Sequence, residues 1–394
     1  MIPKYYEFQN SSKILSGEFA LENIPSELNM LGAKKVLILS DKTLEKIGTL
    51  QVVIDAISTK DIEIVGKYTE IPPDSSIEII NEITKLYKQL DCDSIVAVGG
   101  GSVIDTAKGV RMTLSQQKEN ILELVGCEMI NYGNHIPFVA IPTTSGTGSE
   151  ATIVAVILDK ARNMKMEFIS YFLLPDVSVL DPRMTLSLPA KTTASTGMDA
   201  LCHAIEAYTC LQKNPMSDAY AISAIEIIRD NLIKAVENGN DKKVRLAMAN
   251  ASLMAGVSFS NSMVGVIHAI GHAIGGVSHV PHGDAMSILM PHCMKFNKDK
   301  LKDEYAKLLL HIAGPEVYAN TKYEDRADKT IEYVENMLYK LNKICGLPTK
   351  LSQTNVKKED FNEIAKKALD DGAMIVNPKQ VGFEDVIAIL EKAF

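Results

Sequence analysis

The stretch from Ser94 to Met112 reads SIVAVGGGSVIDTAKGVRM, and it decides how the first half of the chain folds. An apolar run of strand length leads into three glycines and then into a segment of helical character, which predicts a strand, a tight turn and a helix. Gly99, Gly100 and Gly101 let the backbone come close to a bound group, and the helix start after them offers free N–H groups. With Ser102, they predict a turn that binds a pyrophosphate.

Three more apolar runs of strand length belong to the same pattern. They are Val36 to Ser40, Ile62 to Val65 and Phe138 to Ile141, with helical periodicity between them. Such alternation predicts a parallel sheet covered by helices, in which ligands bind at the carboxyl ends of the strands. Asp41 follows one strand, and two interpretations of its carboxylate stay open: it accepts from the ribose hydroxyls of an adenosine, or it caps the helix beginning at Lys42.

The second half of the chain has a different pattern. Residues 177 to 189 contain two prolines and no helical period, which predicts a domain boundary. Beyond them we expect helices over Thr192–Tyr208, Ser217–Ala235, Lys243–Val257 and Met263–Gly275. The expected architecture is an α/β dinucleotide-binding domain with a Rossmann-like parallel sheet over residues 1–185, and an all-α domain over residues 186–394.

Histidines gather in the all-α half. Five of the eight in the chain fall between positions 265 and 292. His268 and His272 are four residues apart, as are Asp199 and His203 in an earlier helix, so each pair shares a helix face. Buried groups of this kind need partners: either the carboxylate bonds an imidazole among unrelated core histidines, or a metal binds several of them.

A shared metal accounts for these residues best. Three imidazoles and one carboxylate suit Fe(II) or Zn(II) and leave room for a substrate oxygen. A metal of this kind, combined with a dinucleotide, indicates hydride transfer in which the metal acts as a Lewis acid. The expected ligands are Asp199, His203, His268 and His282.

Composition narrows the class of protein. The chain has 394 residues and a net charge of −8, with lysines and arginines scattered, which disfavours nucleic acid or an anionic membrane as partner. The first residues lack the pattern of a signal peptide, and no apolar stretch has the length of a membrane span, so we expect a cytoplasmic protein. The six cysteines form no C-x-x-C pair, and we expect reduced thiols. They are Cys92, Cys127, Cys202, Cys210, Cys293 and Cys345, of which Cys202 is expected to be a core residue and not a ligand.

Several motifs in order show a resemblance to a known family. They are GGGSVIDTAK at 99–108, TTSGTGSE at 143–150, LDP at 180–182, TGMDALCHAIEAY at 196–208, and GVIHAIGHAIGG with VPHG between 265 and 283. The chain resembles the iron-containing alcohol dehydrogenases over essentially its full length. The resemblance implies hydride transfer between NAD(H) and a small primary alcohol or aldehyde, with Fe(II), or alternatively Zn(II), and a homodimer or larger homo-oligomer.

The resemblance also implies roles for single residues. His272 matches a histidine that is not a ligand and that positions substrate or relays a proton. An acidic residue at Asp41 is similar to the members that prefer NAD over NADP. The family's metal ligands fall on Asp199, His203, His268 and His282. The cofactor-contacting positions fall on Gly99, Gly100, Gly101, Ser102, Thr143, Thr144, Thr147 and Lys165.

The chain departs from the family pattern in one place and leaves alternatives. Pro72 and Pro73, followed by Asp74, stand where many relatives have Asn-Pro or Glu-Pro near the adenosine, which puts one cofactor hydrogen bond in question. Asn377 and Pro378 of the pocket segment are kept. The alternatives are a zinc-dependent polyol dehydrogenase or a dehydroquinate-synthase-like lyase on the same fold, and a non-catalytic module that binds metal or dinucleotide. His279 and His292 match no functional position.

Overall fold

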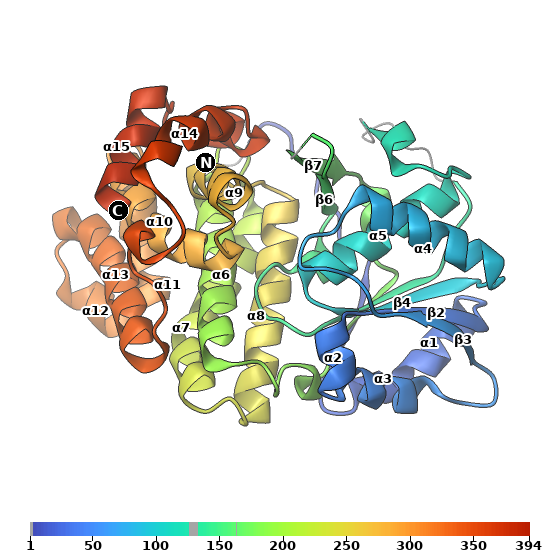
Figure 1. Cartoon of the computed structure of the whole chain (residues 1–394). Coiled ribbons are helices and arrows are strands. Elements are labelled where there is room, and N and C mark those ends of the chain that lie inside the picture. Colours follow the sequence, from blue (N-terminus) through green and yellow to red (C-terminus); the bar gives the residue numbers. More distant parts are fainter. Residues whose placement is uncertain (1–2, 126–132, 163) are drawn as a thin grey trace. The chain divides into compact units, whose positions relative to one another are not determined.

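The computed structural model describes residues 3–125, 133–162 and 164–394. The chain divides into two compact units, which are described separately (Figure 1). One is Gln9–Leu188, and the other combines residues 3–8 with Pro189–Phe394. Within the described ranges, no helix is both long enough and apolar enough to cross a membrane. Cys127, one of the predicted thiols, lies outside the described residues.

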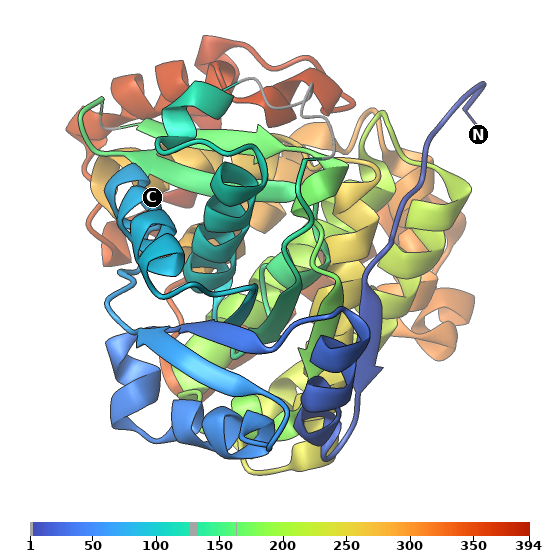
Figure 2. The same cartoon turned by 90° about the vertical axis from the view of Figure 1, so that its right-hand side faces the viewer.

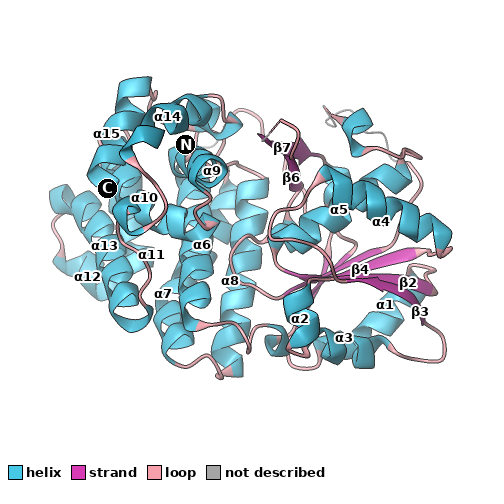
Figure 3. Cartoon of the chain, in the orientation of Figure 1, coloured by secondary structure: helices cyan, strands magenta, loops and turns pink. Residues whose placement is uncertain are grey.

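The unit Gln9–Leu188 contains a six-stranded parallel sheet, which confirms the predicted fold class (Figure 3). The four predicted strands form its centre and one edge. Two further strands, and a separate antiparallel hairpin of β6 and β7, were not expected. In the order β1-β8-β5-β4-β2-β3, the strands are Lys13–Ser16, Val177–Leu180, Phe138–Pro142, Ser94–Gly99, Lys35–Leu39 and Glu63–Tyr68, and the hairpin strands are Val154–Asp159 and Met164–Ile169.

Helices cover both faces of this sheet (Figure 2). In β4, Ile95 and Ala97 pack into one apolar core, while Val96 and Val98 pack into the core on the opposite face. A strand buried on both faces needs no polar alternation, which is why its sequence is continuously apolar. The first core contains α4 (Ile77–Gln89) and α5 (Gly101–Ser115), and the second contains α1 (Ile24–Met30) and α3 (Thr49–Ile57).

The unit that begins at Pro189 contains helices and no strand among its described residues (Figure 3). Three predicted helices match α6, α7 and α8. The fourth prediction is wrong at its start, because the helix begins at Val266 and Met263 has a left-handed φ of 75°. The helices are α6 Ala190–Thr209, α7 Pro215–Glu237, α8 Lys242–Ser260, α9 Val266–Ser278, α10 His282–Asn297, α11 Lys302–Ala313, α12 Pro315–Asn320, α13 Arg326–Cys345, α14 Phe361–Leu369 and α15 Phe383–Ala393.

Helix α6 forms the centre of this unit. Almost every residue from Thr193 to Thr209 is buried, and its apolar residues belong to the largest core of the protein. Its buried residues include two carboxylates, Asp199 and Glu206, and one imidazole, His203. Their spacing of four and then three residues keeps them on one helix face. A buried helix with such a polar row needs partners along it, and these come from α9 and α10.

Candidate metal centre and dinucleotide pocket

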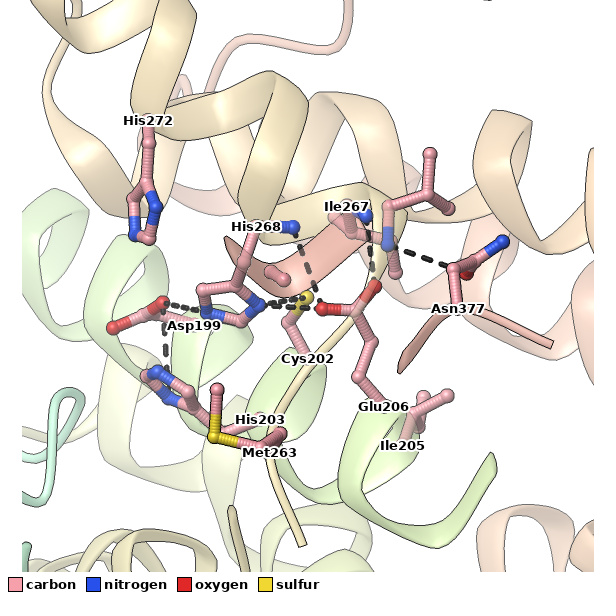
Figure 4. A network of polar contacts seen from close by, with 12 residues as sticks. Asp199, Cys202, His203, Ile205, Glu206, Met263, Ile267, His268, His272 and Asn377 are labelled. Atoms are coloured by element: carbon pink, nitrogen blue, oxygen red, sulfur yellow. Dashed lines mark hydrogen bonds and ion pairs between the residues drawn. The ribbon is translucent and has the colours of Figure 1, made fainter. Parts of the chain in front are cut away.

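The four predicted metal ligands lie together in the helical unit, and Figure 4 shows three of them, Asp199, His203 and His268. Asp199 and His203 come from α6, His268 from α9, and His282 is the first residue of α10. The four donor atoms all lie within 4.8 Å of one another. Asp199 Oδ1 is 3.3 Å from His282 Nε2 and 3.8 Å from both His268 Nε2 and His203 Nδ1.

These donors fit a metal ion better than they fit each other. Among the described residues, Asp199 Oδ1, His203 Nδ1 and His268 Nε2 are buried without a hydrogen-bond partner. Buried polar atoms rarely stay unpaired, because each costs about 1–3 kcal/mol. Ligands bound tetrahedrally at about 2.0–2.1 Å lie roughly 3.4 Å apart. The measured separations are close to that value, so the four residues fit a divalent ion.

A close contact between two helices brings His282 to this group. Next to His282, Gly283 lies so near α6 that a Cβ on it would be 2.5 Å from the Ser195 carbonyl oxygen. The hydroxyl of Ser195 donates to Asp284 Oδ1 at 2.7 Å and fixes the same contact from the other side. Only glycine allows this approach, one turn of α6 before Asp199. The glycine of the VPHG motif is therefore required for the close packing of α10 against α6.

The protonation of the ligands suits a cation. Burial lowers the pKa of His203 to about 3 and also lowers the pKa of His282, so both rings are neutral at pH 7. Burial works to raise the pKa of Asp199, but the imidazoles around it lower that pKa well below its usual value. Asp199 therefore offers a carboxylate, and His203 and His282 offer neutral imidazoles, the forms in which these residues bind metals.

Behind His268 lies a residue that the sequence analysis missed. Glu206 accepts the Nδ1–H of His268 at 2.6 Å, and both side chains are buried. Cys202 lies 3.8 Å from the same nitrogen, but burial raises the pKa of its thiol to about 12 and keeps it neutral. One signal was present in the sequence: Glu206 is a carboxylate on the same face of an otherwise apolar helix as Asp199 and His203.

His272 is held by a second residue that was not predicted. Its Nδ1 donates to Asp371 Oδ2 at 2.9 Å. Burial works to raise the pKa of Asp371, but the bond to His272 outweighs it and lowers that pKa, so the carboxylate is ionised. The imidazole of His272 lies against that of His282, with 5.4 Å between the ring centres. His272 is therefore beside the candidate metal centre without belonging to its ligands.

The surroundings of the metal centre are apolar on one side. The ring of Phe259 stacks on His203 with 4.4 Å between centroids. Phe259 and Met374 also pack against a small apolar cluster formed by Val264, Ala269 and Ala373. These side chains offer no hydrogen-bonding group on that side of the candidate metal centre.

The other unit contains a pocket of about 600 Å³ at the carboxyl ends of its strands. Gly100 is the N-cap of α5 and has no side chain to bond the first amides of this helix. The pocket is therefore suited to an anionic group at a helix N-terminus. Six predicted cofactor residues line it: Asp41, Gly100, Gly101, Ser102, Thr143 and Thr144.

The three remaining predicted cofactor residues, Gly99, Thr147 and Lys165, are not among the pocket's lining residues. A Cβ on Gly99 would be 2.5 Å from Val103, so its glycine is needed within its own turn. Thr147 packs beside Gly101, where a Cβ would lie 3.0 Å from the threonine methyl group. Lys165 pairs with Asp74 at 2.8 Å. These contacts connect the glycine turn, the threonine loop and the hairpin, so some of the glycines serve packing.

Two segments that the sequence left ambiguous have defined contacts. Asp41 caps α2 (Lys42–Lys46), because its Oδ1 accepts from the amides of Thr43 and Leu44 at 2.8 and 3.0 Å. The capping interpretation is therefore correct, and Asp41 still lines the pocket, so the two interpretations do not exclude each other. In the segment Pro72–Asp74, which differs from the family pattern, the Pro73 carbonyl accepts a hydrogen bond from the hydroxyl of Ser102.

A buried polar cluster lies behind the glycine turn. Asp105 accepts from Ser149 at 2.6 Å, and the ammonium group of Lys108 donates to Thr152 and to the Val154 carbonyl. Burial lowers the pKa of Lys108 to about 8 and raises that of Glu150 to about 7. Glu150 Oε1 is buried and lacks a hydrogen-bond partner in the described structure. The cluster ties α5 to the threonine loop at the cost of burying ionisable groups.

Both halves of the chain match known protein families. Residues 11–182 match the family model described as iron-containing alcohol dehydrogenase, and residues 193–394 match the C-terminal model of the Fe-containing alcohol dehydrogenase family. The chain belongs to the iron-containing alcohol dehydrogenase family. It is an oxidoreductase of that family, and its motifs at Gly99–Lys108 and Gly265–Gly283 lie within the two matched regions.

Individual iron-containing alcohol dehydrogenases are similar over nearly their full length. An NAD-dependent methanol dehydrogenase of Bacillus methanolicus is 36% identical, with 96% of this chain and 97% of that protein covered. An NADPH-dependent butanol dehydrogenase of Clostridium saccharobutylicum is 33% identical, with 96% and 95% covered. A crystal structure of 1,3-propanediol oxidoreductase superimposes with a TM-score of 0.93 at 31% identity and covers 99% of this chain and 100% of that one.

Proposed function

We propose that this alcohol dehydrogenase transfers a hydride between NAD(H) and a small primary alcohol or its aldehyde at a divalent metal held by Asp199, His203, His268 and His282. One observation carries the proposal: three buried donor atoms without partners converge with His282 Nε2. A bound divalent ion, proposed to be Fe(II) with Zn(II) as the alternative, would supply Lewis-acid polarisation of the substrate oxygen.

The protein's own residues contribute binding, orientation and proton movement. Asp199 supplies the one negative charge among the ligands, and neutral His203 and His282 supply lone pairs. His272 gives its Nδ1–H to Asp371, which leaves Nε2 as the ring atom that exchanges a proton with substrate. Water is excluded on the side of Phe259 by the apolar cluster packed there.

The proposed preference for NAD rests on charge at the pocket. Asp41 uses Oδ1 to cap α2, and its second oxygen is proposed to accept from the adenosine ribose. Glu70 lies beside it and pairs with Lys42, which adds a second carboxylate to the same rim. Lys42 neutralises Glu70, so the Asp41 carboxylate is the charge proposed to disfavour a 2′-phosphate. The cofactors in the relatives' names differ, so this preference has to be measured.

The apolar cluster supports a short alcohol over a polyol. A polyol would bring several hydroxyl groups against Phe259, Val264 and Met374, none of which offers a side-chain hydrogen bond. Short aliphatic aldehydes are therefore the first substrates to test. Net accumulation of NADH from an alcohol would distinguish a dehydrogenase from a lyase, because a lyase uses NAD only transiently.

The test compares two histidine variants. His268→Ala removes a metal ligand, and we expect no turnover of short aldehydes while NADH binding, followed by its fluorescence, stays within about twofold. The matched control is His279→Asn, which removes an exposed imidazole one residue beyond the same helix. His279 has a left-handed φ of 52°, a conformation that asparagine also adopts. Full activity in His268→Ala, or equal loss in both variants, contradicts the proposal; NADH binding without turnover in wild type favours a non-catalytic module.

A further inference from the structure

The first turn of α9 depends on residues from outside that helix. Its N-cap is Gly265, which has no side chain to accept from the first amides of the helix, and these amides have no partner within the helix. Glu206 Oε1 accepts from the Ile267 amide at 2.7 Å, and Glu206 Oε2 accepts from the His268 amide at 3.3 Å. Asn377 accepts from the Val266 amide at 3.3 Å. Figure 4 shows both side chains reaching the start of α9.

Glu206 has a further contact that Asn377 lacks. The same Oε2 accepts the Nδ1–H of His268 at 2.6 Å, which is the shortest bond in the group. The opposite ring nitrogen, Nε2, is the one directed at Asp199. One carboxylate thus fixes both the backbone and the ring of a single metal ligand.

We propose that Glu206 is a positioning residue for the metal centre: it accepts the Nδ1–H of His268, fixes the ring's orientation, and keeps Nε2 unprotonated as the ligand atom. The inference rests on the proposed function, because it assigns Glu206 a task only if His268 binds a metal. A carboxylate behind a ligand histidine selects its tautomer and increases its basicity. Neither the family comparison nor the spacing of the ligands identifies this residue.

A carboxylate is required because three donors meet two oxygens. A glutamine at position 206 has one oxygen and one NH₂ group. If its oxygen stays on the Ile267 amide, its NH₂ group faces His268 and favours the tautomer with a proton on Nε2. If the amide is turned over, its NH₂ group faces the N–H of Ile267. In the first arrangement a proton occupies Nε2, the atom that should bind the metal. In the second, the NH₂ group and the Ile267 amide are two donors that face each other without an acceptor.

The same contacts argue against a second metal at this place. Cys202, Glu206 and His268 also lie within 4.8 Å of one another and contain common ligand atoms. The oxygens of Glu206, however, already accept from two amides and from the imidazole. An ion there would have to replace the proton on His268 Nδ1 and break the 2.6 Å bond from this nitrogen to Glu206. We therefore expect one metal per chain.

The test measures Co²⁺ binding to the full-length apoprotein. Co²⁺ reports affinity by titration and ligand geometry by its visible absorption bands. In Glu206→Gln we expect Co²⁺ to bind about 10- to 100-fold more weakly, with altered bands. The control is Asn377→Ala, which removes a cap from the same helix without touching His268; we expect lower thermal stability but a Co²⁺ affinity within about threefold of wild type.

The outcomes separate the two proposals. Wild-type protein that binds no Co²⁺ overturns the proposed function. Wild-type protein that binds Co²⁺, together with Glu206→Gln that binds it equally well, overturns only the role of Glu206. Equal weakening in Glu206→Gln and Asn377→Ala also overturns it, because capping alone would explain both. If Glu206→Gln does not fold, Glu206→Asp takes its place: its shorter carboxylate is expected to weaken Co²⁺ binding more than Asn377→Ala does, and an equal effect overturns the proposal.

Discussion

The contact between Gly283 and Ser195 can be tested by adding one methyl group. In Gly283→Ala, the new Cβ would lie 2.5 Å from the Ser195 carbonyl oxygen, whereas ordinary contacts begin at 3.4 Å. The start of α10 must then retreat by roughly 0.9 Å, although a metal site accepts errors of only about 0.2 Å in its ligand distances. Because His282 is the residue before Gly283, this movement pulls a ligand away from Asp199.

The expected result has two parts. Overpacking of this kind lowers the free energy of unfolding by about 1–3 kcal/mol. The affinity for Zn²⁺ should fall at least about 10-fold, which corresponds to about 1.4 kcal/mol. Urea unfolding of the apoprotein measures the first effect, and Zn²⁺ titration against a competing chelator measures the second.

A second glycine provides the matched control. Gly276 lies inside α9, and a Cβ there would meet no atom within 4 Å. Gly276→Ala should therefore stabilise the protein by about 0.5–1 kcal/mol and leave Zn²⁺ affinity unchanged. If Gly283→Ala binds Zn²⁺ as tightly as Gly276→Ala does, the helix contact does not position His282 and the reasoning is refuted.

Three further predictions concern other residues. Asp41→Gly should raise the ratio of kcat/KM for NADPH to that for NADH at least about 10-fold, since a negative charge near the 2′-phosphate is removed; an unchanged ratio contradicts the assignment. Asp371→Asn should lower kcat about 100-fold at unchanged metal content, because His272 loses the partner that fixes its tautomer; a loss of metal instead would indicate a structural role. Glu150 has a pKa of about 7 when folded and an ordinary value of 4.5, so wild type should lose about 2.5 kcal/mol of stability relative to Glu150→Gln as the pH rises from 5 to 8; parallel urea-unfolding stabilities at the two pH values would disprove this.

The sign of the Glu150 prediction follows from burial. A raised pKa means that the folded protein binds the proton more tightly than the unfolded chain does. The stabilisation is complete below pH 4.5 and is lost as the pH rises through about 7. Glutamine does not titrate, so the difference between the two proteins isolates this group.

Much of the sheet was predictable because its central strands are buried on both faces. Ile95 to Val98 is continuously apolar, and that pattern needs no knowledge of its neighbours. The edge strand β1, with sequence KILS, is mostly exposed and carries no such signal. Strand β8 has only four residues, and the prolines after it were interpreted as a boundary. These elements depend on pairing with distant strands.

The helical unit shows the same limit at single residues. A spacing of four places Asp199 and His203 on one helix face and His268 on one face with His272, whereas His282 was chosen from the histidine cluster and the family motif. The shared helix face was a signal for Glu206, but neither its role nor that of Asp371 could be assigned, since their partners are 62 and 99 residues away in the sequence. The start of α9 was also misjudged, because the left-handed Met263 leaves no periodic signal.

The central claim is that four residues hold one catalytic metal. Its most direct test is elemental analysis of protein purified without oxygen, combined with NADH oxidation by short aldehydes before and after chelation. The account predicts about one metal per chain, and activity that chelation removes and added metal restores. Turnover that persists in metal-free protein would contradict it.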